Sequence, residues 1–130
     1  MADYTLVNLK EVEDQAPRFG LSPNWEIRMA RVALELQQSG VSYQRLEPNF
    51  RLPFGHKHKR QEEVYVLIGG SVRIKLEDEV VELKPLDAVR VHQDTMRGFE
   101  AGPDGAELIS IGAPNTGPGD GETVQGWWSD

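Results

Sequence analysis

The 130-residue chain contains no cysteine. This absence excludes disulfide bonds, zinc sites built from thiolates and a cysteine nucleophile. No stretch reaches the roughly 18 apolar residues that a membrane span needs. The amino-terminal sequence MADYTLVNLKEVED also lacks the basic region and the apolar run of a secretory signal. We therefore expect a cytoplasmic protein with no membrane partner.

Positive charge is scarce as well. The chain has 14 Lys and Arg residues against 21 Asp and Glu residues, and its formal net charge is -7. A nucleic-acid-binding surface needs a basic face that neutralises phosphates, so we expect no nucleic-acid partner. The expected partners are a small-molecule ligand and a second copy of the chain. The length fits one domain over residues 1–130.

Short segments with β-branched or alternating residues recur between Gly, Pro, Asn and Asp. These segments are YTLVNL, RVALELQQ, VSYQRLEP, EVYVLIG, SVRIKLE, EVVELKP, DAVRVH, RGFEAG and AELISIG. The pattern predicts an all-β sandwich or barrel. In SVRIKLE, Val72, Ile74 and Leu76 share one face, and charged residues occupy the other. Turn residues at 38–41 and 77–79 predict hairpins, and therefore an antiparallel sheet.

Two segments fit this pattern less well. A helix over 25–38 competes with a strand over 33–38, because the segment contains good helix formers and a glycine that can cap the end; we favour the strand. From Ala113 onward, APNTGPGDGETVQGWWSD is dense in Pro and Gly, and we expect a tail without regular structure. Trp127 and Trp128 at its tip must bury apolar area. They pack on their own barrel, on a second subunit or on a ligand.

Two of the three histidines, His56 and His58, are one residue apart in FGHKHKRQEEVYVLIGG. On a β-strand both imidazoles project from one face, and Glu62 keeps the same parity. Two imidazoles and one carboxylate form a ligand set that suits iron (Fe), manganese (Mn), nickel (Ni), copper (Cu) or zinc (Zn). The histidine pair taken alone fits a solvated basic stretch equally well, because Lys and Arg flank it.

The longer pattern resembles the first motif of the cupin family, in which His-x-His is followed by three or four residues, Glu, six residues and Gly. The spacing from His58 to Glu62 and Gly69 matches, with the strand VYVLIG between the last two. Glu63 and Gly70 satisfy the four-residue variant, so Glu63 is the second choice of ligand.

The resemblance extends over about 30–113. The upstream segment VSYQRLEPNFRLPFGHKH is also similar to cupins, with Asn49 where glycine is usual. Asn visits the left-handed conformation more readily than most residues do. The resemblance implies a double-stranded β-helix, the jelly-roll barrel of the family. An N-terminal arm over 1–29 and the C-terminal tail over 114–130 would flank this core.

The second cupin motif is degenerate in this chain. Aligned on the strand AVRV, its fixed positions hold Leu86, His92, Asp94, Arg97 and Ala101, none of which is the family's residue. Arg97 replaces the last metal-binding histidine, and a permanent cation without a free lone pair cannot bind a metal. Alternation points Arg97 inward and His92 outward.

Besides an assembly protein, in which the barrel mainly serves dimerisation through exterior strand edges and the tail with Trp127 and Trp128, two functions remain open at this point. In the first, a divalent metal on His56, His58 and Glu62 makes the protein an enzyme that oxidises or isomerises a small anionic molecule, with Arg97 and Phe99 binding the substrate. In the second, Glu62 and Arg97 neutralise each other in a metal-free cupin that binds or senses a ligand without catalysis. A homodimer is expected in both cases. The predicted cavity wall consists of His56, His58, Glu62, Val64, Val66, Arg97, Phe99 and Ile109.

Overall fold

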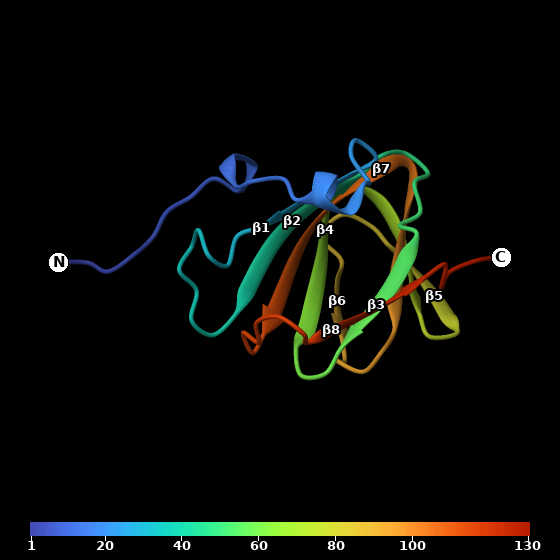
Figure 1. Ribbon diagram of the computed structural model, residues 1–130. Coiled ribbons are helices and arrows are strands. Elements are labelled where there is room, and N and C mark those ends of the chain that lie inside the picture. The colour runs from blue at the N-terminus through green and yellow to red at the C-terminus, as the bar shows by residue number, and fades with distance from the viewer.

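The computed structural model describes residues 1–130 and consists almost entirely of strands. Two short 3-10 helices, η1 (Leu9–Glu11) and η2 (Ala16–Phe19), precede eight strands. Neither helix could span a membrane. The strands are β1 (Trp25–Met29), β2 (Gly40–Leu46), β3 (Phe54–His58), β4 (Glu62–Leu76), β5 (Glu79–Leu83), β6 (Ala88–Val91), β7 (Arg97–Ala113) and β8 (Gly121–Gln125). They form one antiparallel sheet that curls into a barrel (Figure 1). The all-β prediction is confirmed.

Two long strands, β4 and β7, organise this barrel. They pair with each other along nearly their whole length, and each merges two of the segments predicted as separate strands. The register shifts twice between Leu67 and Val72. At the second shift Gly70 has a φ of 74°, and a Cβ there would lie 2.0 Å from the backbone oxygen of Gly105. A glycine is therefore needed for the two strands to bend together.

Alternate side chains of the long strands fill the interior. Tyr65 and Ile74 on β4 and Phe99 on β7 are at most 2% exposed, and the rings of Tyr65 and Phe99 meet edge to face with centroids 4.9 Å apart. Val72 lies on the same inner face as Ile74, as the alternation in SVRIKLE predicts. The predicted turn at 77–79 also forms, because Glu77 adopts a positive φ of 51° between β4 and β5.

In the region 25–46 the structure corrects three predictions. Trp25–Met29 is a strand, every residue of which pairs with β2, so neither a helix over 25–38 nor a strand over 33–38 forms. The tight hairpin at 38–41 is also wrong, because residues 38 and 39 end the long connection from β1, and Gly40 and Val41 already belong to β2. Trp25 and Ile27 become buried against the core in this pairing. Burial and strand partners outweigh the intrinsic helix propensity of the segment.

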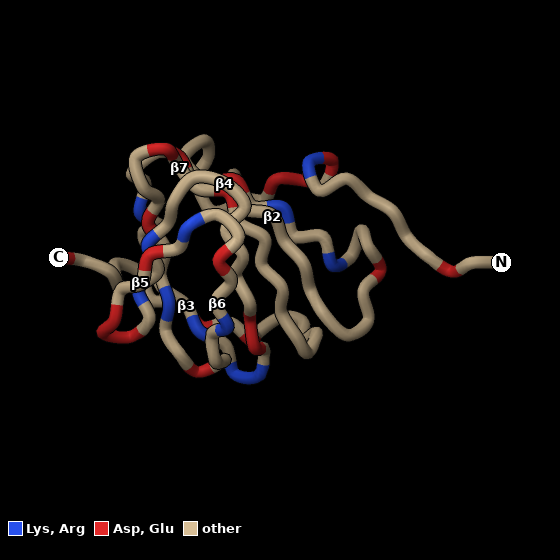
Figure 2. Tube along the Cα trace, turned by 180° about the vertical axis from the view of Figure 1, so that it is seen from behind, with Lys and Arg blue, Asp and Glu red and all other residues tan.

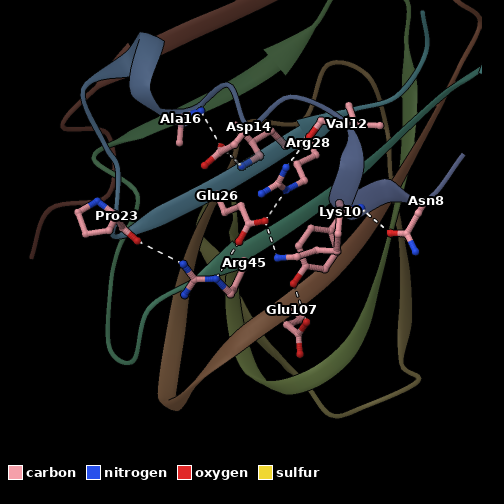
Figure 3. A network of polar contacts seen from close by, with 12 residues as sticks. Asn8, Lys10, Val12, Asp14, Ala16, Pro23, Glu26, Arg28, Arg45 and Glu107 are labelled. Carbon is pink, nitrogen blue, oxygen red and sulfur yellow. Dashed lines mark hydrogen bonds and ion pairs between the residues drawn. The ribbon is translucent and has the colours of Figure 1, made fainter. Parts of the chain in front are cut away.

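A polar network fastens the segment before β1 to the outer face of the sheet (Figure 3). Glu26 lies at its centre and is 6% exposed. It accepts hydrogen bonds from Lys10 at 2.7 Å, from Arg45 at 3.0 Å and from Arg28. Burial raises the pKa of Glu26, but the three cations outweigh burial and lower the pKa to about 2. The predicted strand YTLVNL does not form, and the residues before η1 extend away from the barrel (Figure 1).

The C-terminal segment is part of the sheet, so the prediction of a tail without regular structure is wrong. Gly121–Gln125 pairs with β3 over its full length. This short strand forms despite the surrounding Gly and Pro because β3 has a free edge. β3 otherwise shares a single register pair with β7.

Both tryptophans of this segment pack on their own barrel, which was one of the three predicted alternatives. The ring of Trp127 covers β3 so closely that a Cβ at Gly55 would lie 2.6 Å from it. The guanidinium of Arg51 lies 4.4 Å from the centre of a Trp128 ring, a cation–π geometry. Arg51 also pairs with Glu100 at 2.8 Å. Basic and acidic residues are similarly interspersed over the rest of the chain (Figure 2).

Candidate metal centre

β3 presents His56 and His58 from the same face, as their spacing predicts. The two ring centroids are 5.2 Å apart and the ring planes are nearly perpendicular, at 88°. The His56 side chain is 23% exposed and the His58 side chain 15%. Both imidazoles are therefore largely withdrawn from water but remain accessible.

Glu63, and not Glu62, completes the cluster. Oε1 of Glu63 lies 3.3 Å from Nε2 of His56 and 3.2 Å from Nε2 of His58. One donor atom from each of the three residues lies within 4.8 Å of the other two. The Glu62 side chain is 54% exposed and has Arg90 3.9 Å away. The preference for Glu62 is wrong on geometry, and the four-residue spacing describes the cluster.

The parity argument failed because the chain turns between the histidines and the glutamates. Residues 59–61 bend between β3 and β4, so the alternation on one strand does not continue onto the next. On β4 itself, Glu63 belongs to the inner set with Tyr65 and Leu67, which are 1% and 0% exposed. Once the burial of Tyr65 and Leu67 is known, the alternation along β4 identifies Glu63.

Arg97 lies inside the barrel, as its alternation with its neighbours predicts. It is opposite His56 in the β3–β7 register and is 0% exposed. Its Nη1 donates to Oε1 of Glu63 at 2.8 Å, and its Nη2 donates to the backbone oxygen of His92 at 2.8 Å. The predicted ion pair with Glu62 is therefore wrong, because Glu63 takes that place. The His92 side chain is exposed, as predicted.

The other predicted cavity residues do not reach the cluster. Phe99 belongs to the packed core. Val64, Val66 and Ile109 lie on the outer face, because their neighbours on β4 and β7 take the inner positions. The phenol of Tyr65 contacts the cluster instead and donates to Oε1 of Glu63.

Burial and hydrogen bonding set the charge of each group. Burial raises the pKa of Glu63, but contacts with His56, His58 and Tyr65 outweigh it and hold the pKa well below its usual range. Burial lowers the pKa of His56. Burial also lowers the pKa of His58, but contacts with Glu63 and Asp120 outweigh burial, and the pKa of His58 is raised overall. With neutral imidazoles, the carboxylate of Glu63 and the guanidinium of Arg97 cancel, and the cluster has no net charge.

The cluster fits a divalent metal. Nε2 of His58 is buried and makes no hydrogen bond, although Oε1 of Glu63 is close. Nδ1 of the same ring lies 3.0 Å from Oδ2 of Asp120. With the proton on Nδ1, Nε2 offers a lone pair to the cluster. The contacts from His56, Tyr65 and Arg97 all use Oε1 of Glu63, so its second oxygen remains as a donor.

Comparison with solved structures identifies the fold. A cupin protein from Bacteroides fragilis matches with a TM-score of 0.71 and 23% identity, over 88% of this chain and 87% of the other. A Streptomyces structure of Pac13 with uridine matches with a TM-score of 0.72 and 15% identity, over 96% of this chain and 92% of the other. Pac13 is described as a nucleoside dehydratase.

Oxalate decarboxylase from Bacillus subtilis matches with a TM-score of 0.75 and 17% identity, over 96% of this chain and 33% of the enzyme. No family model matches the sequence, and no curated protein sequence matches it. At these identities the likeness shows the fold. The chain has the cupin fold, and the prediction of a double-stranded β-helix is confirmed.

Proposed function

We propose that the protein is a small-molecule-binding cupin in which His56, His58 and Glu63 hold a divalent metal and act on a small anionic organic substrate. The observation that carries this proposal is the buried Nε2 of His58, which makes no hydrogen bond, in a residue that shares the cluster with two other potential metal ligands, His56 and Glu63. A buried polar atom without a partner is unfavourable, and a metal would satisfy it.

Charge balance supports an anionic substrate. The charges of Glu63 and Arg97 already cancel, so a divalent ion would add two positive charges that the cluster does not balance. Asp120, behind His58, offsets one of them at most. A carboxylate or another anionic oxygen donor would supply the missing negative charge in this largely desolvated place.

Arg97 acts on such a substrate through Glu63 and not by direct contact. Both of its terminal nitrogens are occupied, and the side chain is fully buried. Together with Tyr65 it holds Oε1 of Glu63 and thereby orients the carboxylate. A bound metal would supply Lewis acidity to a substrate oxygen, and a redox-active ion such as Fe or Mn would suit oxidation whereas Zn would suit isomerisation.

One observation favours a second function, that of a metal-free ligand-binding or sensing cupin. Arg97 already neutralises Glu63 across 2.8 Å, with the two side chains 0% and 13% exposed. A metal would have to share Glu63 with this buried cation, which opposes its charge. In this alternative the ion pair is permanent and the histidines act as neutral hydrogen-bonding groups.

Adjacent glutamates provide a matched test of the two functions. Tag-free wild type, His56→Ala, Glu63→Gln and Glu62→Gln are produced with Fe, Mn, Ni, Cu and Zn in the medium, and their metal content is measured. We expect about one metal per chain in wild type and in Glu62→Gln, and loss of metal in the other two. Wild-type protein without stoichiometric metal would reject the metalloenzyme and favour the metal-free function.

A further inference from the structure

The strand that carries both histidines is held mainly by the C-terminal segment. β3 shares five register pairs with β8, compared with its single pair to β7. Trp127 closes the same region by packing against Gly55. The C-terminal segment is therefore part of the wall behind the histidines.

Asp120, directly before β8, forms the closest link in this wall. Its residue is 8% exposed, and its Oδ2 lies 3.0 Å from Nδ1 of His58. The same carboxylate accepts hydrogen bonds from the backbone nitrogens of Arg60 at 3.0 Å and Gln61 at 3.2 Å. Its backbone oxygen accepts from the nitrogen of Lys59 at 2.9 Å. Asp120 thus holds the turn between the histidine strand and the glutamate strand.

We infer that Asp120 is a positioning residue that keeps the proton of His58 on Nδ1 and so leaves the Nε2 lone pair directed into the cluster. An ionised carboxylate has no hydrogen to donate, so the imidazole must donate from the nitrogen that faces it. Both elements that a metal ligand requires, ring orientation and tautomer, then come from one side chain. The use of Nε2 for a metal rests on the proposed function, but the tautomer does not.

The two histidines consequently have opposite tautomers in the metal-free protein. Nε2 of His56 faces the acceptor Oε1 of Glu63 at 3.3 Å and carries the proton there. Without Asp120, the proton of His58 is free to move to Nε2, where the same oxygen lies 3.2 Å away. His58 would then adopt the tautomer of His56, and a metal would have to displace that proton.

The test is the ring nitrogen chemical shifts of metal-free, 15N-labelled protein at pH 8.0, together with Zn²⁺ titrations followed by calorimetry. The variants are Asp120→Asn and Asp120→Ala. Glu122→Gln is the control, because Glu122 lies on β8 with a side chain that is 48% exposed and 4.0 Å from Lys57. In wild type and control we expect the proton on Nδ1 of His58 and on Nε2 of His56.

In both Asp120 variants we expect the His58 proton to move to Nε2 and Zn²⁺ affinity to fall by about 10- to 100-fold. Asp120→Asn keeps the side-chain shape and an acceptor for the turn, so it decides the matter if Asp120→Ala does not fold. A wild-type His58 protonated on Nε2, or an Asp120→Asn protein with wild-type tautomer and Zn²⁺ affinity, would overturn the inference. Wild type with the Nδ1 tautomer but no Zn²⁺ binding would leave the inference standing and reject the proposed metal site.

Discussion

The substitution Arg97→Met separates the two counterions that Glu63 could have, a guanidinium or a metal. Methionine retains an unbranched side chain but removes the charge that lies 2.8 Å from Oε1 of Glu63. In the metal-free protein the Glu63 carboxylate, 13% exposed, then lacks a cationic partner. Removing one member of a buried ion pair costs about 3 to 5 kcal/mol. We expect the free energy of unfolding of the metal-free variant to fall by about 3 kcal/mol.

Metal binding should respond in the opposite direction. A unit charge about 5 Å from a divalent ion, at an effective dielectric near 20, repels it by roughly 6 to 7 kcal/mol. Screening by Glu63 and by water reduces this value, and we expect a gain of about 100-fold in affinity, or about 2.7 kcal/mol. Because the ion would take over the neutralisation of Glu63, saturating metal should restore most of the lost stability.

Urea denaturation of wild type and Arg97→Met, each with a chelator and with saturating Zn²⁺, measures both effects. Arg90→Met is the control, because this arginine is 62% exposed and lies 3.9 Å from Glu62; it should change neither quantity. Arg97→His offers a third imidazole, and so a fourth protein ligand, and should also tighten metal binding. If both Arg97 variants bind Zn²⁺ no more tightly than wild type does, the reasoning that places Arg97 against the metal is refuted.

Three further predictions concern the fold and the assembly. The folded-state pKa of Glu26, about 2 against an ordinary 4.5, corresponds to about 3 kcal/mol of stability that is complete above pH 4.5 and lost as the pH falls toward 2. Urea unfolding should therefore show that Glu26→Gln lowers the free energy of unfolding at pH 7 and lowers it less at pH 3. A difference between the two proteins that does not change with pH would contradict this prediction. Leu86 has a φ of 76° and is 81% exposed, so Leu86→Gly should raise the free energy of unfolding by about 0.5 to 1 kcal/mol by relieving left-handed strain. Leu86→Ala, which keeps the strain, should show no such gain in the same denaturation assay. We also propose a homodimer through the outer face of β4 and β7, where Ile68 and Ile111 are 44% and 41% exposed and lie near outward-facing valines. Sedimentation should show that Ile111→Lys separates the subunits while Val80→Lys, on β5, does not, and a monomeric wild type would reject the interface.

Local patterns were sufficient where the relevant neighbours are close in the chain. The spacing of His56 and His58 determines that both rings share a face of any strand they form. The alternation around Ile74 and around Arg97 likewise determines which side chains point inward. Asn49, where glycine is usual in cupins, adopts a positive φ of 62°, a conformation that Asn tolerates better than most residues do. These features depend on strand parity and backbone conformation, which a few residues decide.

Local patterns failed where a distant strand competes with local preference. Trp25–Met29 contains good helix formers, yet it becomes a strand because β2 offers backbone partners and the core offers burial to Trp25. Gly121–Gln125 looks like part of a flexible tail, yet the free edge of β3 makes it a strand. Neither partner can be read from the segment itself.

The sequence by itself determined the all-β class and the chemical kinds of group in the cluster: two imidazoles, a carboxylate and an arginine in place of a histidine. Only the tertiary structure decided between Glu62 and Glu63, because a turn separates them from the histidines and interrupts strand parity. It also decided that Glu63 is the partner of Arg97. Asp120, 62 residues from His58, joins the cluster through strand pairing alone. Parity is a local property of the chain, whereas pairing across the sheet is not.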